Sequence, residues 1–118
     1  MAETKTYKGG CHCGKVSYDA TVDLSQVIEC NCSHCRRKGF LLTFVPAGQF
    51  TLESGEGALT DYLFHKHAIS HRFCATCGAQ PFAEGEQEGA ATRAVNLRCV
   101  PDCDLGALEI RNVDGASF

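Results

Sequence analysis

Cysteine is the residue that most constrains this chain, because nine of its 118 residues are cysteine and seven of the nine fall into three short clusters. In chain order the clusters are Cys11 with Cys13, Cys30 with Cys32 and Cys35, and Cys74 with Cys77. Thiolates one or two residues apart can bind the same small metal ion, typically zinc at about 2.3 Å from each sulfur. The spacing therefore predicts a fold that is held together by metal.

The length and composition predict one domain that spans residues 1–118. We expect this domain to be cytoplasmic. The N-terminus lacks the apolar segment of a secretory signal, and the apolar runs are far shorter than the roughly 20 residues of a membrane span. Clustered cysteines in a reducing cytosol bind metal more often than they form disulfides, and an odd number argues against a complete disulfide framework. The familiar iron–sulfur spacings are absent, so zinc is the expected metal.

The charge balance bears on the class of partner. The chain has 11 basic and 14 acidic residues, for a net charge of −3. Nucleic-acid-binding proteins usually carry a basic surplus or a basic stripe, and neither is present. We therefore expect no nucleic-acid partner and no membrane partner.

Short strand patterns dominate the chain. Val16, Tyr18, Ala20 and Val22 alternate with polar residues, as in a half-buried strand. Further strand-like runs are 41–45, 50–53, 61–65, 67–73, 94–98 and 108–113, and turn signals occupy 46–48, 54–57 and 84–89. Only Ser33–Gly39 has a helical pattern, with Gly39 placed to end the helix. The pattern predicts a mainly β protein of short, bent antiparallel sheets with one short helical turn.

The first and third clusters together have four thiolates, the number that a closed tetrahedral zinc site requires. Cys11 and Cys13 lie about sixty residues before Cys74 and Cys77, so a shared ion would clamp two distant turns. We expect this zinc to be structural, because metal-binding energy is folding energy in a small domain.

The histidines near these clusters have less distinctive positions. His12, between two predicted ligands, is expected to point away from the metal. His71 is interpreted as a group that hydrogen-bonds near the site rather than as a ligand. His65 and His67 alternate along a predicted strand and are interpreted as structural residues.

The second cluster offers only three sulfurs, Cys30, Cys32 and Cys35. Zinc with three protein ligands keeps a fourth position open for water or substrate, which distinguishes catalytic from structural sites. Three thiolates also leave the metal a better Lewis acid than four, and a thiol that binds it is deprotonated. Cys30, Cys32 and Cys35 are therefore the predicted catalytic residues.

Two remaining cysteines leave an alternative open. Cys99 would complete the second site and make it closed and inert, or it is an ordinary buried thiol. Cys103 is interpreted as a loop thiol.

Basic residues follow Cys35 directly. Arg36 and Arg37 are candidates for binding a carboxylate of an anionic ligand, and the alternative is a solvated basic turn. His34 is either a proton donor or acceptor near the open position or an exposed turn residue.

Three segments, each built around one cysteine cluster, resemble the glutathione-dependent formaldehyde-activating enzyme family, which includes centromere protein V. The segments are 9–16, 29–37 and 71–78, and the likeness extends over nearly the whole chain. The resemblance implies the zinc-stapled fold called a β-tent. It also implies two zinc ions: a structural one at Cys11, Cys13, Cys74 and Cys77, and a catalytic one at the second cluster.

The resemblance further implies an activity. The family's named reaction adds glutathione to formaldehyde and gives S-hydroxymethylglutathione, so the implied class is carbon–sulfur lyase with glutathione as co-substrate. The implied partners are a small thiol and a small aldehyde. The likeness to centromere protein V permits an alternative, a non-catalytic zinc module for protein–protein interaction.

Overall fold

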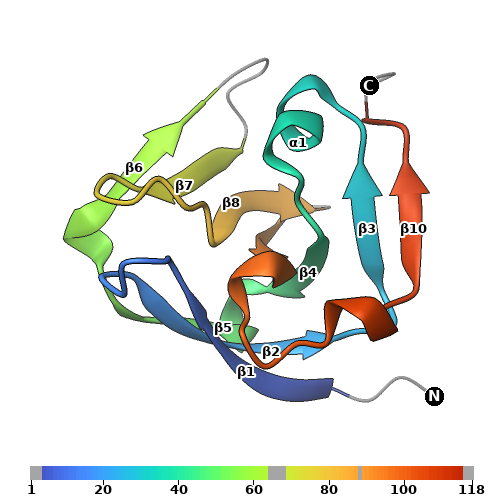
Figure 1. Ribbon diagram of the computed structural model, residues 1–118, viewed down its shortest axis with the longest axis horizontal. Helices are drawn as coiled ribbons and strands as arrows, with labels where there is room; N and C mark the ends of the chain where they lie inside the picture. The colour runs from blue at the N-terminus through green and yellow to red at the C-terminus, as the bar shows by residue number, and fades with distance from the viewer. Residues whose placement is uncertain (1–3, 64–68, 88, 116–118) are drawn as a thin grey trace.

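The computed structural model describes residues 4–63, 69–87 and 89–115, and in these ranges the strands form two sheets (Figure 1). The strands are β1 Thr4–Gly10, β2 Ser17–Asp23, β3 Val27–Cys30, β4 Leu42–Pro46, β5 Phe50–Ser54, β6 Leu59–Tyr62, β7 Ser70–Cys74, β8 Phe82–Gln87, β9 Ala90–Asn96 and β10 Ile110–Val113. The helices are α1 Ser33–Lys38 and four short 3₁₀ helices, Ala47–Gln49, Glu56–Ala58, Leu97–Cys99 and Leu105–Ala107. The structure is mainly β, as the sequence predicts.

The smaller sheet has the order β1-β2-β5, with both pairs antiparallel. Its central strand buries Tyr18, Ala20 and Val22 and turns the intervening residues outward, which confirms the predicted alternation. This sheet therefore presents one apolar face to the rest of the molecule.

The larger sheet has the order β10-β3-β4-β9-β8-β7-β6. Adjacent strands in this sheet are antiparallel except for β10 and β3, which run parallel to each other with Val113 opposite Cys30. The parallel pair brings the C-terminal strand beside the second cysteine cluster, an arrangement that local sequence patterns do not indicate.

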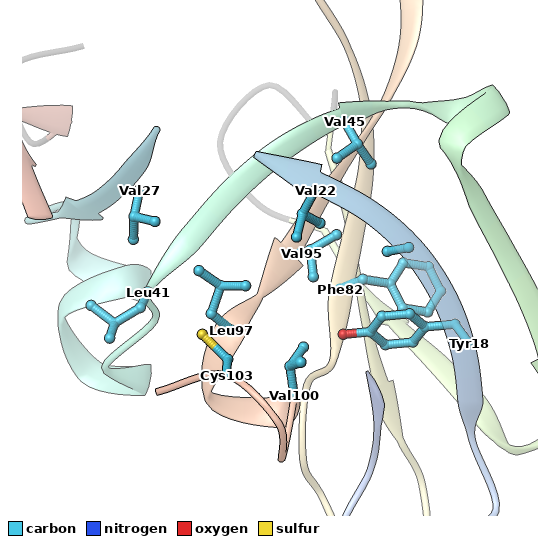
Figure 2. Close-up of a cluster of buried hydrophobic side chains, with 11 residues drawn as sticks. Tyr18, Val22, Val27, Leu41, Val45, Phe82, Val95, Leu97, Val100 and Cys103 are labelled. Atoms are coloured by element: carbon cyan, nitrogen blue, oxygen red, sulfur yellow. The ribbon is translucent and has the colours of Figure 1, made fainter. Parts of the chain in front are cut away.

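The core lies between the two sheets. Tyr18 stacks on Phe50 with ring centroids 4.7 Å apart and meets the edge of Phe82 at 6.0 Å. Figure 2 shows Val95, Leu97, Val100 and Cys103 among the other side chains of this cluster, so Cys103 lies in a loop, as predicted, and its thiol is buried in the core. Burial of such apolar side chains is the main favourable contribution to folding.

Helix α1 confirms the predicted helical turn at Ser33–Gly39. It begins after Cys32, whose Sγ accepts a hydrogen bond from the Cys35 amide at 3.3 Å. It ends at Gly39, which has a φ of 72° and donates its amide to the Cys35 carbonyl. No helix in the described ranges has the length and apolar character needed to cross a membrane.

Several element predictions need correction. The stretch 84–89 was expected to be a turn, but residues 84–87 continue β8, where Glu84 pairs with Arg93 at 3.2 Å across the ladder. Strands β1 and β3 were not predicted from the sequence. The strand expected at 94–98 ends at Asn96, because the Asn96 side chain accepts a hydrogen bond from the Arg98 amide and starts a 3₁₀ helix. The predicted strands 61–65 and 67–73 lie partly outside the described residues.

Candidate metal centres

The four thiols of the first and third clusters come together in one group. Cys11 and Cys13 lie in the turn between β1 and β2, and Cys74 and Cys77 lie at the end of β7 and in the turn after it. Their sulfurs lie within 4.8 Å of one another, with 3.5 Å from Cys11 to Cys13 and 3.6 Å from Cys13 to Cys74. Sulfurs about 2.3 Å from one ion in a tetrahedron are about 3.8 Å apart, so this group fits a zinc-sized ion.

Backbone amides aim at these sulfurs. The Val16 amide donates to Cys11 Sγ at 3.3 Å, and the turns are followed by Gly14 and Gly78, with φ values of 86° and 81°. The Ala79 amide, followed by the Cys13 amide, lowers the pKa of the Cys77 thiol to about 6. A thiol that is ionised near neutral pH is ready to bind a cation.

The three thiols of the second cluster form a separate group at the end of β3 and in α1. Their sulfurs also lie within 4.8 Å of one another, and Cys35 is the buried member. Burial opposes ionisation of Cys32, but hydrogen bonds from the amides of Cys35 and His34 outweigh it and lower the pKa of this thiol. Burial raises the pKa of Cys35, and the neighbouring thiols Cys32 and Cys30 raise it further. In the free protein the thiol of Cys32 therefore ionises more readily than the thiol of Cys35.

The C-terminal strand flanks this second group. The Asn31 amide donates to the Val113 carbonyl at 3.1 Å, and Asn31 Nδ2 donates to Asp114 Oδ1 at 3.0 Å. These contacts join residues more than eighty positions apart, and the sequence patterns give no signal for them.

An open pocket of about 480 Å³ adjoins the second group. Cys30 and Cys35 form part of its wall, together with Arg36, Glu29 and Asp114. The wall of the pocket therefore includes one arginine and two acidic residues beside the cysteines.

The two arginines proposed as ligand-binding residues differ in position. Arg36 lines this pocket, whereas Arg37 is not part of its wall and donates Nη1 to the Ser33 carbonyl at 2.8 Å. Successive helical residues are rotated by about 100°, which explains why neighbours in sequence face different surroundings.

On α1, His34 packs in a group of rings rather than in an exposed turn. Its centroid lies 5.5 Å from Phe40, 5.3 Å from Tyr62 and 4.3 Å from His71. Burial, followed by the charge of Lys38, lowers the pKa of His34.

His71 belongs to this ring group rather than to the surroundings of the first metal group. Its Nδ1 lies 3.3 Å from Gln80 Nε2, and burial, with smaller effects of His34 and Lys38, lowers its pKa to about 4. The Gln80 carbonyl accepts from Asn96 Nδ2 at 3.0 Å and from Cys99 Sγ at 3.7 Å. A series of contacts thus runs from Cys99 to the Gln80 backbone carbonyl, from the Gln80 side chain to His71, and from the His71 ring to His34 of α1.

Cys99 contacts residues outside the second group. Besides its contact with Gln80, its Sγ lies 3.6 Å from Asn96 Nδ2. Burial raises the pKa of Cys99 to about 11, with the thiols of Cys11 and Cys77 adding to the effect, so Cys99 lies on the side of the first group. The three-sulfur group in the described residues does not include Cys99, whose contacts are with Gln80 and Asn96, so Cys99 as a fourth ligand of the second site stays a prediction. His12 is exposed, and His65 and His67 lie outside the described residues.

The family model described as "Glutathione-dependent formaldehyde-activating enzyme" matches residues 6–109. A crystal structure of a Rhodobacter sphaeroides protein is similar, with 28% sequence identity and a TM-score of 0.78 over 88% of this chain and 99% of that chain.

We expect Cys74→Ser to remove one equivalent of bound metal and to lower the temperature of unfolding, because three sulfurs then remain to clamp the two turns. Metal content by native mass spectrometry and unfolding by circular dichroism measure both effects. Cys99→Ser is the control and should keep the wild-type metal content. A folded Cys74→Ser protein with undiminished metal would contradict the assignment.

We expect His71 to remain neutral until the pH approaches 4, whereas an ordinary histidine has a pKa of 6.5. The unfolded chain binds this proton more tightly, so His71 makes folding stability fall as the pH drops from 6.5 towards 4. Histidine ring resonances followed by NMR measure the titration, with His71→Asn identifying the signal. A midpoint near 6.5 would show that the imidazole is not desolvated.

Proposed function

This chain belongs to the glutathione-dependent formaldehyde-activating enzyme family, and we propose that it is a zinc-dependent carbon–sulfur lyase. In this proposal it adds glutathione, or a related thiol, to formaldehyde or another small aldehyde, and it catalyses the reverse elimination. One observation carries the proposal: a group of three sulfurs adjoins an open pocket whose wall includes one arginine and two acidic residues.

The two sulfur groups suit two different roles. Four thiolates around Zn²⁺ give a closed site of charge −2, and we assign a structural zinc to Cys11, Cys13, Cys74 and Cys77. Three thiolates give a charge of −1 and leave one coordination position, and we assign a catalytic zinc to Cys30, Cys32 and Cys35. The second zinc, when bound, would supply Lewis acidity and stabilise the thiolate form of an incoming thiol.

The pocket residues would position the thiol substrate. Glutathione carries two carboxylates and one ammonium group at neutral pH, and the pocket offers complementary charges from Arg36 and from Glu29 and Asp114. A guanidinium can accept a carboxylate with two parallel hydrogen bonds, which fixes orientation as well as position. Holding the thiol beside the aldehyde lowers the entropic cost of the encounter.

The reaction needs no oxidant or reductant. The sulfur forms a bond to the carbonyl carbon, the π electron pair moves to the carbonyl oxygen, and that oxygen takes up a proton equivalent to the one that the thiol released. The reverse reaction breaks the same carbon–sulfur bond and returns the thiol and the aldehyde.

The position of Cys99 favours this enzyme over the non-catalytic module. The module would gain support from a fourth sulfur at the second site, and Cys99 instead lies beside Gln80 and Asn96. We assign the chain to the cytosol, a reducing compartment in which clustered cysteines bind metal more often than they form disulfides.

The activity is tested by measuring the rate of condensation between glutathione and formaldehyde, because this reaction also proceeds without enzyme. We expect the zinc-loaded wild type to exceed the spontaneous rate and Cys32→Ser to fall to it, since only two ligands of the catalytic zinc then remain. Exchange spectroscopy by NMR measures the rate at equilibrium, and Cys99→Ser should retain the wild-type rate. A wild-type protein with two zinc ions and no rate above background would leave the module as the better assignment.

Substrate binding is tested at the two neighbouring arginines. We expect Arg36→Ala to raise the KM for glutathione about tenfold or more with little change in kcat, because a hydrogen bond to a charged group contributes about 1.5–3 kcal/mol. Arg37→Ala is the matched control, since Arg37 does not line the pocket.

The Arg36→Ala and Arg37→Ala variants are also compared with glutathione whose carboxylates are esterified. The difference between Arg36→Ala and wild type should shrink with the ester, because the charge that Arg36 would bind is blocked. Equal effects of the two arginine variants on KM would rule out a specific role for Arg36.

A further inference from the structure

We propose that the C-terminal segment Val113–Gly115 is part of the second metal centre, and that position 115 must be glycine because the metal-binding sulfur of Cys30 fills the space of a side chain. The inference rests on the proposed function in one respect, the assignment of zinc to Cys30, Cys32 and Cys35. The segment lies beyond residues 6–109, the part of the chain that the family model matches.

The segment is fixed to the cluster by its backbone and by one side chain. Strand β10 runs parallel to β3 with Val113 opposite Cys30, and the Asn31 amide continues this ladder by donating to the Val113 carbonyl at 3.1 Å. Asn31 Nδ2 then donates to Asp114 Oδ1 at 3.0 Å. Asn31 lies between two of the three ligands, so these contacts hold the peptide that connects Cys30 to Cys32.

Gly115 lies directly against the same two ligands. A Cβ atom at this position would overlap Cys30 Sγ and lie 3.4 Å from Cys32 Cβ. Gly115 is not among the glycines with positive φ, so its backbone is one that other residues adopt. The requirement for glycine is therefore one of space and not of backbone conformation.

Metal binding makes this lack of space consequential. In the free protein, Cys30 can avoid a new methyl group by rotating its side chain into another staggered conformer. In the metal-bound protein its sulfur must remain about 2.3 Å from the ion in a tetrahedral arrangement. A methyl group at position 115 thus penalises the metal-bound state more than the free state and weakens binding at this centre alone.

The test compares zinc affinities of full-length variants by competition with a chromophoric chelator, while native mass spectrometry counts the ions. Gly115→Ala should keep the first zinc and bind the second about 10- to 100-fold more weakly, the usual effect of altering groups that orient metal ligands. Gly48→Ala is the matched control: a Cβ there would meet nothing within 4 Å, and its φ is not positive, so both affinities should stay at the wild-type value. Equal second-site affinity in Gly115→Ala and wild type would overturn the proposal.

A second pair of variants keeps the proposal testable if Gly115→Ala does not fold. Asp114→Ala removes the acceptor for Asn31 Nδ2 and should also weaken the second zinc, whereas Asp114→Asn keeps an acceptor oxygen and should restore its affinity. Wild-type affinity in Asp114→Ala would contradict a role for the segment in holding Asn31.

The outcomes also separate this inference from the proposed function. A wild type that binds two zinc ions without accelerating the condensation would contradict the proposed function, and the metal affinities of the variants would still decide the role of the segment. An active enzyme whose Gly115→Ala variant binds zinc normally would contradict the inference alone.

Discussion

The contact between the sulfurs of Cys13 and Cys74, 3.6 Å apart, is the interaction on which the rest of the structure depends. It joins the turn between β1 and β2, in the smaller sheet, to the end of β7 in the larger sheet. Lys15 Nζ, which donates to Thr76 Oγ1 at 3.1 Å, is a further link between the same two turns. A chain of this size buries a limited apolar core, so a metal ion held by these four cysteines, as we propose, would contribute much of what fixes the relative position of the two sheets.

The two sulfur groups differ in their surroundings, and this difference favours different roles. The first group is formed by two turns, and their amides point at the sulfurs of Cys11 and Cys77. The second group lies between α1 and the C-terminal strand and borders a pocket with both signs of charge. A closed set of four ligands suits a structural ion, and three ligands beside a pocket suit an ion that a substrate reaches.

The region between the two groups is polar and partly buried. Gln80 contacts Cys99 and Asn96 through its carbonyl and His71 through its side-chain amide, and His71 packs edge-on to His34 of α1. The desolvated imidazole of His71 remains neutral at neutral pH, since burial lowers its pKa to about 4. A neutral, hydrogen-bonded ring can support the position of α1 without adding a positive charge near the thiolates.

The sequence by itself determined the features that depend on residues close together in the chain. Spacings of two and three residues identified the candidate metal ligands within each cluster, alternation identified β2, and Gly39 marked the end of α1. The count of four thiolates also indicated that the first and third clusters belong together. Only the tertiary structure decided the contacts of Cys99 with Gln80 and Asn96, and the approach of Asp114 and Gly115 to Asn31 and Cys30. The contacts of Asp114 and Gly115 follow from the parallel pairing of β10 with β3, two strands about eighty residues apart, and the residue pattern within either strand does not indicate which strand lies beside it.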